Sequence, residues 1–289
     1  PPGVPTMNAA TVVSATEIRW NFTDADNNFF GTDVADAAGT MVSPQWPNAG
    51  WLDHNATSWS ESALTPNTEY SRKVRTWNGT LNSAIFSNTM TARTLSVSPD
   101  ASSIVANTTT PLAGENVVWT AVNGFGPGKV QYYRYAWDTN PTHTFTDSEA
   151  TWSGGTLPLV PTGSGVWYLH VKGYNAADVG NGTFDYSVTA TSPAPPTVTT
   201  AVSRKTHGSA GVFDIDVLAA GAVEPRKNGP TLLLVTFDQD VQQTSGTVSD
   251  VSLSSGTVSA LAISGNQLTV TMSGAADIAL LTVGFPGIR

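Results

Sequence analysis

The sequence predicts an all-β protein built from three antiparallel β-sandwich domains in tandem. Apolar residues recur at every second position in many short segments, which is the period of a strand with one buried face. Turn signals rich in Gly, Asn and Pro separate these segments, and helical patterning is almost absent. Two Pro-rich stretches divide the 289 residues into thirds, each near the ~100 residues of one small sandwich.

The two Pro-rich stretches set the expected domain boundaries. Proline fixes φ and removes a backbone donor, so such stretches favour extended linkers. TLSVSPDASS covers residues 94–103, and TSPAPPTVTT covers residues 191–200. We therefore expect domains at 1–95, 96–194 and 195–289. Tryptophan occurs five times in the first segment, four times in the second and never in the third, so the modules are not close repeats.

Strict alternation marks one clear strand in each expected domain. Every second residue of such a strand faces the same side, so the apolar set should enter the core. The expected inward residues are Ile18, Trp20 and Phe22 in the first domain, Trp167, Leu169 and Val171 in the second, and Phe213, Ile215 and Val217 in the third.

The last segment contains seven strand candidates, and its end raises a question of completeness. The candidates lie at 199–203, 212–218, 232–238, 248–253, 257–263, 267–272 and 280–285. A sandwich of this kind is expected to carry one more closing strand, and without it an edge keeps unpaired N–H and C=O groups. The segment is then either a trimmed fragment or is completed by a strand from a neighbouring subunit. A contact of the second kind that does not close would give a filament.

The stretch LTPNTEY, residues 64–70, predicts a corner between two strands. Leu64 would enter the core, Pro66 would stiffen the turn, and the Tyr70 hydroxyl would bond a backbone group a few residues upstream. A corner of this kind is typical of a structural module.

With Pro5 and Trp20, this corner resembles the fibronectin type III module over residues 1–95. Arg72 departs from that family, which places an inward aliphatic side chain two residues after the tyrosine. We therefore expect either a local bulge or an Arg72 side chain that extends to solvent.

The other two segments resemble further extracellular modules. VQYYRYAWDTNP (130–141) and GVWYLHVKGYN (165–175) resemble immunoglobulin-like modules of bacterial secreted proteins. SRKTHGSAGVFDIDV (203–217) and GPTLLLVTFDQDV (229–241) resemble a β-sandwich module near the carboxyl end of large exported bacterial proteins. These resemblances imply an extracellular, multi-module bacterial protein, and they carry no active-site residues across.

Composition excludes several functional classes. Net charge is −9 and Lys/Arg clusters are absent, which argues against a nucleic-acid partner. With no cysteine, disulfides, thiol catalysis and zinc–thiolate sites are excluded. No run of 18 apolar residues exists, so no membrane span is expected. The chain begins PPGVP without Met or a signal peptide, and we expect it to be an internal piece of a longer or processed protein.

Motifs of catalysis and metal binding are weak. The four histidines form no HxH or HExxH pattern, no G-x-S-x-G elbow is present, and His170 is expected to face outward from its strand. Asp24, Asp26 and Asn28 have the spacing of a calcium loop, but Phe29 replaces the required Gly. A polar strand connection explains them, and a weak Ca²⁺ site is the alternative. We expect no cofactor and no catalytic residues.

Trp46, Trp51 and Trp59 lie close in sequence beside His54 and form the candidate ligand site. An exposed aromatic strip could stack on sugar rings. Alternatively, the three rings cover one end of the sandwich or a seam between domains, since large aromatic side chains usually bury area.

Five Asn-x-Ser/Thr triplets are candidate glycosylation sites, at Asn21, Asn55, Asn78, Asn107 and Asn181. In a chain rich in Thr and Asn such triplets also arise by chance. Glycans are expected only if an organism that glycosylates exports the protein.

The sequence therefore predicts a non-enzymatic extracellular or cell-surface protein with a structural or adhesive role, including that of a subunit in a surface filament. Its partners would be other copies of itself, cell-surface proteins or polysaccharide. The alternative is a set of carbohydrate-binding accessory modules of a secreted hydrolase, and a hydrolase itself is a third class. Exposure of the Trp46, Trp51 and Trp59 rings would distinguish the alternative from the first reading.

Overall fold

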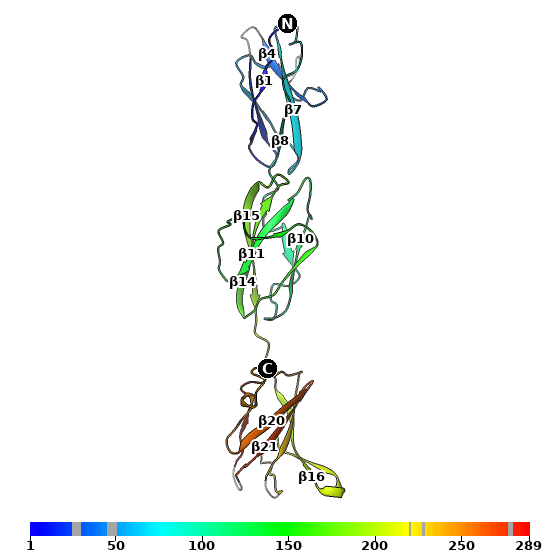
Figure 1. Cartoon of the computed structure of the whole chain (residues 1–289), viewed down its shortest axis with the longest axis vertical. Coiled ribbons are helices and arrows are strands. Elements are labelled where there is room, and N and C mark those ends of the chain that lie inside the picture. Colours follow the sequence, from blue (N-terminus) through cyan, green and yellow to red (C-terminus); the bar gives the residue numbers. More distant parts are fainter. Residues whose placement is uncertain (25–29, 45–50, 220, 227–228, 277–279) are drawn as a thin grey trace. The chain divides into compact units, whose positions relative to one another are not determined.

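The computed structural model describes residues 1–24, 30–44, 51–219, 221–226, 229–276 and 280–289. Within these residues every pairing between named strands is antiparallel, and the helical elements are two 3-10 turns, η1 (Gly208–Ala210) and η2 (Val248–Asp250). The predicted all-β class is confirmed. No helix in the described part is long and apolar enough for a membrane span. The chain forms two compact units, Pro1–Ser192 and Pro193–Arg289 (Figure 1).

The amino-terminal part of the first unit is a sandwich of two sheets, which we call the first sandwich. In one sheet β3 pairs with β1, β2 and β6, and the other has the order β5-β4-β7-β8. The strands are β1 (Thr6–Met7), β2 (Thr11–Val12), β3 (Ile18–Thr23), β4 (Gly31–Asp36), β5 (Leu52–Asp53), β6 (Ser58–Glu61), β7 (Glu69–Trp77) and β8 (Met90–Arg93). Buried side chains from both sheets form one core cluster.

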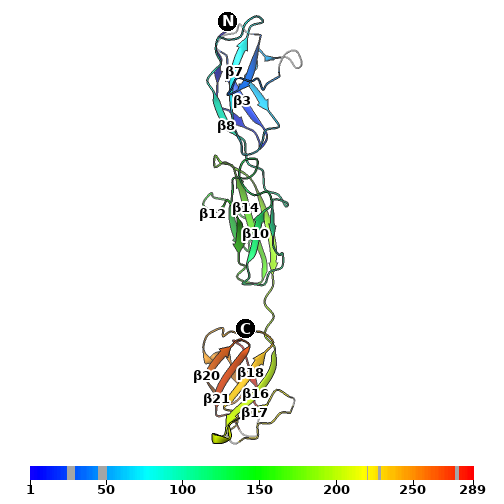
Figure 2. The same ribbon diagram turned by 90° about the vertical axis from the view of Figure 1, so that its right-hand side faces the viewer.

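The rest of the first unit is the second sandwich, which has its own core cluster. One sheet has the order β13-β10-β9, and the other has the order β12-β11-β14-β15. Figure 2 labels β10 of the first sheet and β12 and β14 of the second. The strands are β9 (Ile104–Ala106), β10 (Val117–Ala121), β11 (Tyr132–Asp138), β12 (Ala150–Trp152), β13 (Thr156–Leu159), β14 (Gly165–Tyr174) and β15 (Gly180–Ala190).

The second unit contains a five-stranded sheet of order β17-β16-β18-β21-β20 and a two-stranded sheet, β19-β22. The strands are β16 (Val198–Thr206), β17 (Val212–Asp216), β18 (Leu232–Phe237), β19 (Ser252–Leu253), β20 (Thr257–Ser264), β21 (Gln267–Ser273) and β22 (Val283–Gly284). The carboxyl end lies within this unit, because Ile288 is 8% exposed and Arg289 exchanges backbone hydrogen bonds with Gln242.

Alternation predicted the core well where a second sheet faces the strand. Ile18, Trp20 and Phe22 are at most 2% exposed, and Leu169 and Val171 are fully buried. Each of these strands lies opposite a sheet that covers its apolar face.

The core position predicted for Phe213 is wrong. Phe213 is 50% exposed, while Ile215 and Val217 are half-buried. β16 pairs with β18 only as far as Ser203, and Phe213 lies further along the β16–β17 hairpin, opposite Lys205. The outer part of this hairpin therefore has no neighbouring strand on the β16 side among the residues that the structure describes.

The strand predicted at 248–253 begins instead with the 3-10 turn η2. The Asp250 carboxylate is 3% exposed and accepts hydrogen bonds from Ser245 and Gly246, which holds the chain in a turn. Only Ser252–Leu253 extends as β19, and it pairs with β22. Local hydrogen bonds to an Asp side chain thus replace the strand ladder here.

The corner predicted at Leu64–Tyr70 is confirmed. The Tyr70 hydroxyl accepts a hydrogen bond of 2.9 Å from the backbone N–H of Thr65, and Leu64 is 8% exposed within the core cluster. The bond closes the turn while the tyrosine ring packs against the core.

Arg72 is buried and paired, so neither predicted explanation for it holds. Its side chain forms two hydrogen bonds to the Glu61 carboxylate, Nη2 to Oε1 at 2.5 Å and Nε to Oε2 at 2.8 Å. The Trp20 indole N–H also donates to Glu61 Oε2, at 2.8 Å. The guanidinium lies 5.7 Å from the centre of the Trp20 ring. A bidentate ion pair within the sandwich therefore replaces the expected aliphatic contact.

The corner also joins the two sandwiches of the first unit. Asn67, at its tip, is fully buried, and its side chain donates to Gly126 O at 2.9 Å and accepts from Ala176 N at 2.8 Å. Asn175 donates to Thr94 O at 2.9 Å, across the same boundary. We call this set of contacts the junction.

Removal of the Glu61 charge should destabilise the first unit far more than removal of an exposed carboxylate. Glu61→Gln leaves the Arg72 charge buried without its counter-ion, and breaking such a pair costs about 3–5 kcal/mol. Glu69→Gln is the matched control, since its bond to Arg93 is 3.4 Å long and its side chain is 58% exposed. That substitution should cost less than about 1 kcal/mol. Every tryptophan lies in residues 1–192, so urea unfolding followed by tryptophan fluorescence reports this unit. Equal losses in the two variants would contradict a buried pair.

Candidate functional site

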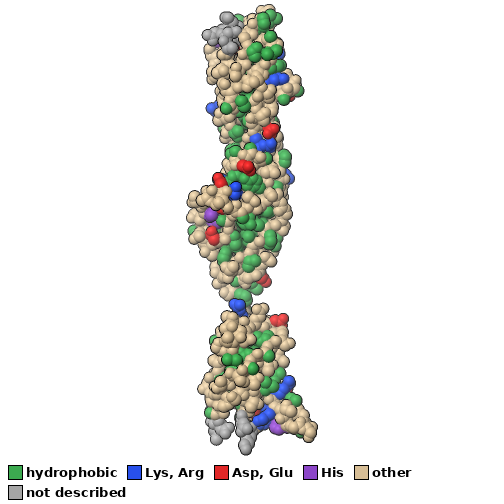
Figure 3. Space-filling model, viewed as in Figure 1, with side chains coloured by type: hydrophobic (Ala, Val, Ile, Leu, Met, Phe, Trp, Pro, Cys, Tyr) green, Lys and Arg blue, Asp and Glu red, His purple; other side chains and the backbone are tan. Residues whose placement is uncertain are grey.

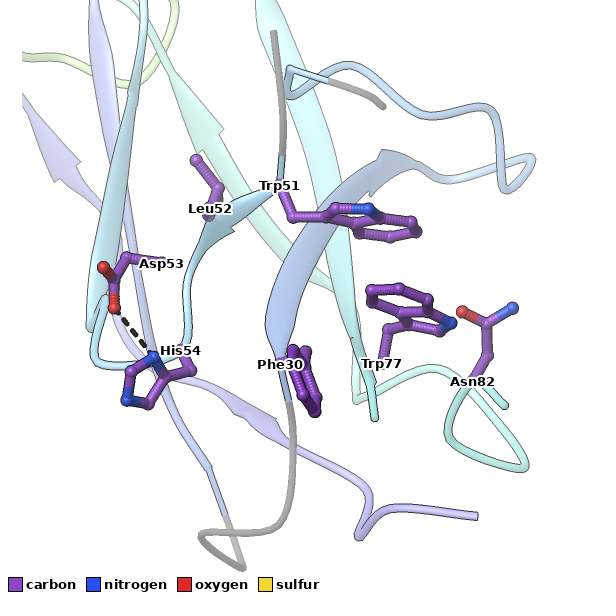
Figure 4. A pocket seen from close by; sticks show the side chains of 7 residues that line it. All are labelled: Phe30, Trp51, Leu52, Asp53, His54, Trp77 and Asn82. Atoms are coloured by element: carbon purple, nitrogen blue, oxygen red, sulfur yellow. Dashed lines mark ion pairs between the residues drawn. The ribbon is translucent and has the colours of Figure 1, made fainter. Parts of the chain in front are cut away.

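An aromatic cleft of about 700 Å³ lies at one end of the first sandwich (Figure 4). It is lined by Phe30, Trp51, Leu52, Asp53, His54, Trp77 and Asn82. Trp77 is the last residue of β7, and Tyr70 lies near the start of that strand. The cleft and the corner are therefore at opposite ends of β7.

Gly31 explains how two tryptophans meet in the cleft. Gly31 begins β4 between its partners Asp53 on β5 and Trp77 on β7. A Cβ atom at Gly31 would lie 2.7 Å from Trp51 Cβ and 2.9 Å from Leu52 O, closer than real Cβ contacts allow. Because glycine leaves this space open, the Trp51 ring stacks on Trp77, with ring centroids 4.9 Å apart and planes 10° apart.

Phe30 adds an exposed ring to this pair. Its centroid lies 6.1 Å from that of Trp77, at an interplanar angle of 64°, and the residue is 71% exposed. A Cβ atom at Gly79 would lie 3.4 Å from this ring, so the turn after β7 approaches it closely. The three rings make an aromatic wall (Figure 4), in which Phe30 is exposed and the two tryptophans are half-buried.

A turn places Asn82 beside Trp77. The Asn78 side chain accepts hydrogen bonds from the backbone N–H groups of Thr80 and Leu81, and Trp77 and Asn82 form an isolated β-bridge. The NG pair at 78–79 thus forms the predicted turn, with Gly79 at φ 91°. The exposed Asn82 side chain makes no hydrogen bond to any residue that the structure describes.

Asp53 and His54 supply the other polar groups of the cleft. Asp53 Oδ1 accepts from Asn55 N at 2.8 Å and lies 3.2 Å from His54 Nδ1 (Figure 4). Both side chains are more than half exposed. The cleft therefore combines aromatic faces with amide, carboxylate and imidazole groups.

The three tryptophans of the sequence-based candidate have different positions. Trp51 lines the cleft, while Trp59 lies opposite Trp20 in the β3–β6 ladder and packs against the core. Trp46 lies outside the described residues. Sequence reasoning missed Trp77 and Phe30, although the NG turn directly after Trp77 indicated that it ends a strand.

The candidate metal residues are only partly described. Asp24 follows β3, whereas Asp26 and Asn28 lie outside the described residues. Among the residues that the structure describes, no group of three or more His, Cys, Asp or Glu could hold a metal ion.

His170 alternates with the core residues Leu169 and Val171 and so faces outward from its strand as predicted, but it is fully buried. Its Nδ1 lies 2.6 Å from Asp185 Oδ1, and its Nε2 lies 3.1 Å from Asn140 O. The connection between β11 and β12 covers this face of the sheet and also stacks His143 on His170, with ring centroids 5.4 Å apart. Because both ring nitrogens have partners, the geometry fits an anchor for this connection.

The five sequon asparagines differ in how their side chains are used. The amide nitrogen that a glycan would occupy donates to Ala9 O in Asn21 and to Ser96 O in Asn181. Asn78 and Asn107 form their hydrogen bonds through Oδ1, and Asn55 is exposed, with Nδ2 3.0 Å from His54 Nε2. Asn55, Asn78 and Asn107 are therefore the sequons whose amide nitrogens have no backbone partner in the described part.

Comparisons with known proteins find only structural similarity. No protein family and no curated protein matches the chain. A two-domain fibronectin type III segment of chicken tenascin has a TM-score of 0.41 and 14% identity, over 64% of this chain and 99% of that one. The FN1–FN3 domains of chicken CNTN1 have a TM-score of 0.32 and 13% identity, over 98% of this chain and 87% of that one. Because both similarities are weak, the description of the fold rests on the strand pairing above.

Acid should loosen the connection between β11 and β12 through Glu149. A hydrogen bond from the backbone N–H of Thr146, with further bonds from His143 and the Thr146 hydroxyl, lowers the pKa of Glu149 from 4.5 to about 2. A depressed folded-state pKa gives stability that is present above pH 4.5 and is lost as pH falls toward 2. In urea unfolding at a series of pH values, Glu149→Gln should lose less stability than the parent across this window. Parallel pH profiles for variant and parent would contradict the assignment.

Proposed function

We propose that this chain is a non-enzymatic, multi-module structural or adhesive protein of the bacterial cell surface or extracellular space. Its three modules at 1–95, 96–194 and 195–289 would be a fibronectin type III-like sandwich, an immunoglobulin-like sandwich and a further sandwich. The modules hold shape and present their ends and edges to partners. Those partners are other copies of the chain, cell-surface proteins or polysaccharide.

The junction is the observation that carries this proposal. Contacts between modules are usually mobile unless the interface is well packed. Here Asn67 and Asn175 are at most 1% exposed, and both cross the boundary with side-chain hydrogen bonds to backbone groups. Separation of the modules would leave these buried polar groups without their hydrogen-bond partners, so opening the boundary costs free energy. A coupled boundary suits a protein that transmits force from one module to the next.

Buried polar side chains in structural contacts support the non-enzymatic part of the proposal. Glu61 pairs with Arg72, His170 lies between Asp185 and Asn140, and Asp250 holds a turn. Each of these groups has partners that account for its burial. On the face seen in Figure 3 uncharged groups predominate, as expected for a chain with 12% charged residues.

The sheet edge at β17 supports self-association. Among the described strands β17 pairs with β16 alone, and two of its apolar residues are exposed, Val212 at 56% and Phe213 at 50%. An exposed apolar edge strand is a template for strand addition from another chain. Addition at this edge is the route we propose to a filament.

The junction predicts coupled unfolding of the first two modules. A fragment of residues 1–192 should melt in one calorimetric transition, and Asn67→Ala should split it or broaden it, since Ala removes the bonds to Gly126 and Ala176. Asn107→Ala is the control, because Asn107 is exposed and its described hydrogen bonds lie within the second sandwich. Residues 1–95 alone should still fold cooperatively, with a lower melting temperature. A failure of that fragment to fold would make residues 1–192 one indivisible domain.

The β17 edge predicts concentration-dependent association of the full chain. Sedimentation velocity should show larger species as concentration rises, and Phe213→Lys should weaken association because a charged edge resists strand addition. Val223→Lys is the matched control, since Val223 is 70% exposed in the same unit and lies outside the strands. A parent that stays monomeric, or equal effects of both lysines, would overturn self-association through this edge.

A further inference from the structure

We infer that the aromatic cleft of the first sandwich is a binding site for a neutral polysaccharide whose sugar rings carry equatorial hydroxyls, as in β-linked glucans and chitin. The inference rests on the adhesive role proposed above and gives it a ligand. It moves the sugar-binding surface from Trp46, Trp51 and Trp59 to the wall formed by Phe30, Trp51 and Trp77.

The aromatic wall fits the apolar side of such a sugar. When all hydroxyls of a pyranose are equatorial, both faces of the ring present C–H groups, which pack against aromatic rings. Trp51 and Trp77 are fixed by their mutual stacking, and Phe30 extends the wall into solvent. At about 700 Å³ the cleft lies within the range of about 300–1,000 Å³ common for small-ligand sites.

The polar groups fit the hydroxyls around the ring. The Asn82 amide offers donors and an acceptor beside Trp77 and has no hydrogen-bond partner in the described part of the chain. At the other side of the cleft, Asp53 Oδ1 is engaged with Asn55 and His54, while its Oδ2 makes no described hydrogen bond. Sites with aromatic walls and a few polar groups of this kind orient a ligand by its hydroxyls.

The charges of the cleft and of the whole chain favour a neutral ligand over an anionic one. No Lys or Arg is among the residues lining the cleft, and the chain has a net charge of −9. A polyanion would therefore meet an unfavourable field with no cation to pair with. The cleft is also preformed, because Gly31 and the stacked tryptophans fix the wall before any ligand arrives, which lowers the ordering cost of binding.

The test titrates the full chain with cellohexaose and with the hexamer of N-acetylglucosamine, and uses polygalacturonate as the anionic comparison. Isothermal calorimetry should show saturable binding of at least one neutral oligosaccharide with Kd below about 1 mM. Phe30→Ala and Asn82→Ala should each weaken that binding by about fivefold to tenfold, because each removes one contact worth about 1 kcal/mol. Both residues are exposed, so the fold should survive, and unchanged melting temperatures check this.

Ile85→Ala is the matched control, since Ile85 is 66% exposed in the same sandwich and does not line the cleft. It should bind the neutral oligosaccharide with the affinity of the parent.

Three results would overturn the inference: binding of neither neutral hexamer, binding of polygalacturonate alone, or equal affinities for all three variants. If Phe30→Ala reduces self-association and leaves sugar binding unchanged, a second copy occupies the cleft and the inference also fails. Loss of sugar binding leaves the junction and edge experiments unaffected, so the two proposals fail separately.

Discussion

The corner from Leu64 to Tyr70 is the contact on which the first unit depends. Leu64 fixes one end of the turn in the core, and the Tyr70 hydroxyl closes it on Thr65. The tip then holds Asn67 at φ 47°, a left-handed conformation that asparagine tolerates better than most residues. In that position the Asn67 amide reaches backbone groups of the second sandwich. One short turn therefore connects the packing of the first core to the position of its neighbour.

Burial of polar groups imposes the second constraint. A charge or amide can leave water only when partners replace its hydration. Arg72 satisfies this rule through the Glu61 carboxylate and His170 through Asp185 and Asn140. Asn67 does so through three residues of the second sandwich, Gly126, Gln131 and Ala176. Each network joins residues far apart in the chain, so each also specifies which segments lie together. Specificity of this kind matters in a protein whose sandwiches otherwise share similar apolar patterns.

The ends and edges of the sandwiches are the surfaces to which a ligand or another chain can bind. One face of each core strand packs inward, whereas the end of β7 leaves aromatic rings partly uncovered and β17 leaves a sheet edge open among the described strands. Gly31 is the residue that makes the first of these sites, because its missing side chain lets Trp51 lie against Trp77. The proposed adhesive and assembly functions thus use surfaces that the β-sandwich architecture leaves free.

The sequence by itself determined the all-β class, the alternating core of β3 and β14, and the corner at Tyr70, because these depend on local period and turn chemistry. It also identified Trp51 as a candidate ligand residue, but it could not find Trp77, which lies 26 positions along the chain and meets Trp51 only across two strand pairings. The partner of Arg72, the burial of His170 and the exposure of Phe213 were likewise not predicted. The tertiary structure decided these three features, because each depends on which distant segment packs against that face of a strand. Alternation shows which residues share a face, but it does not show which segment packs on it.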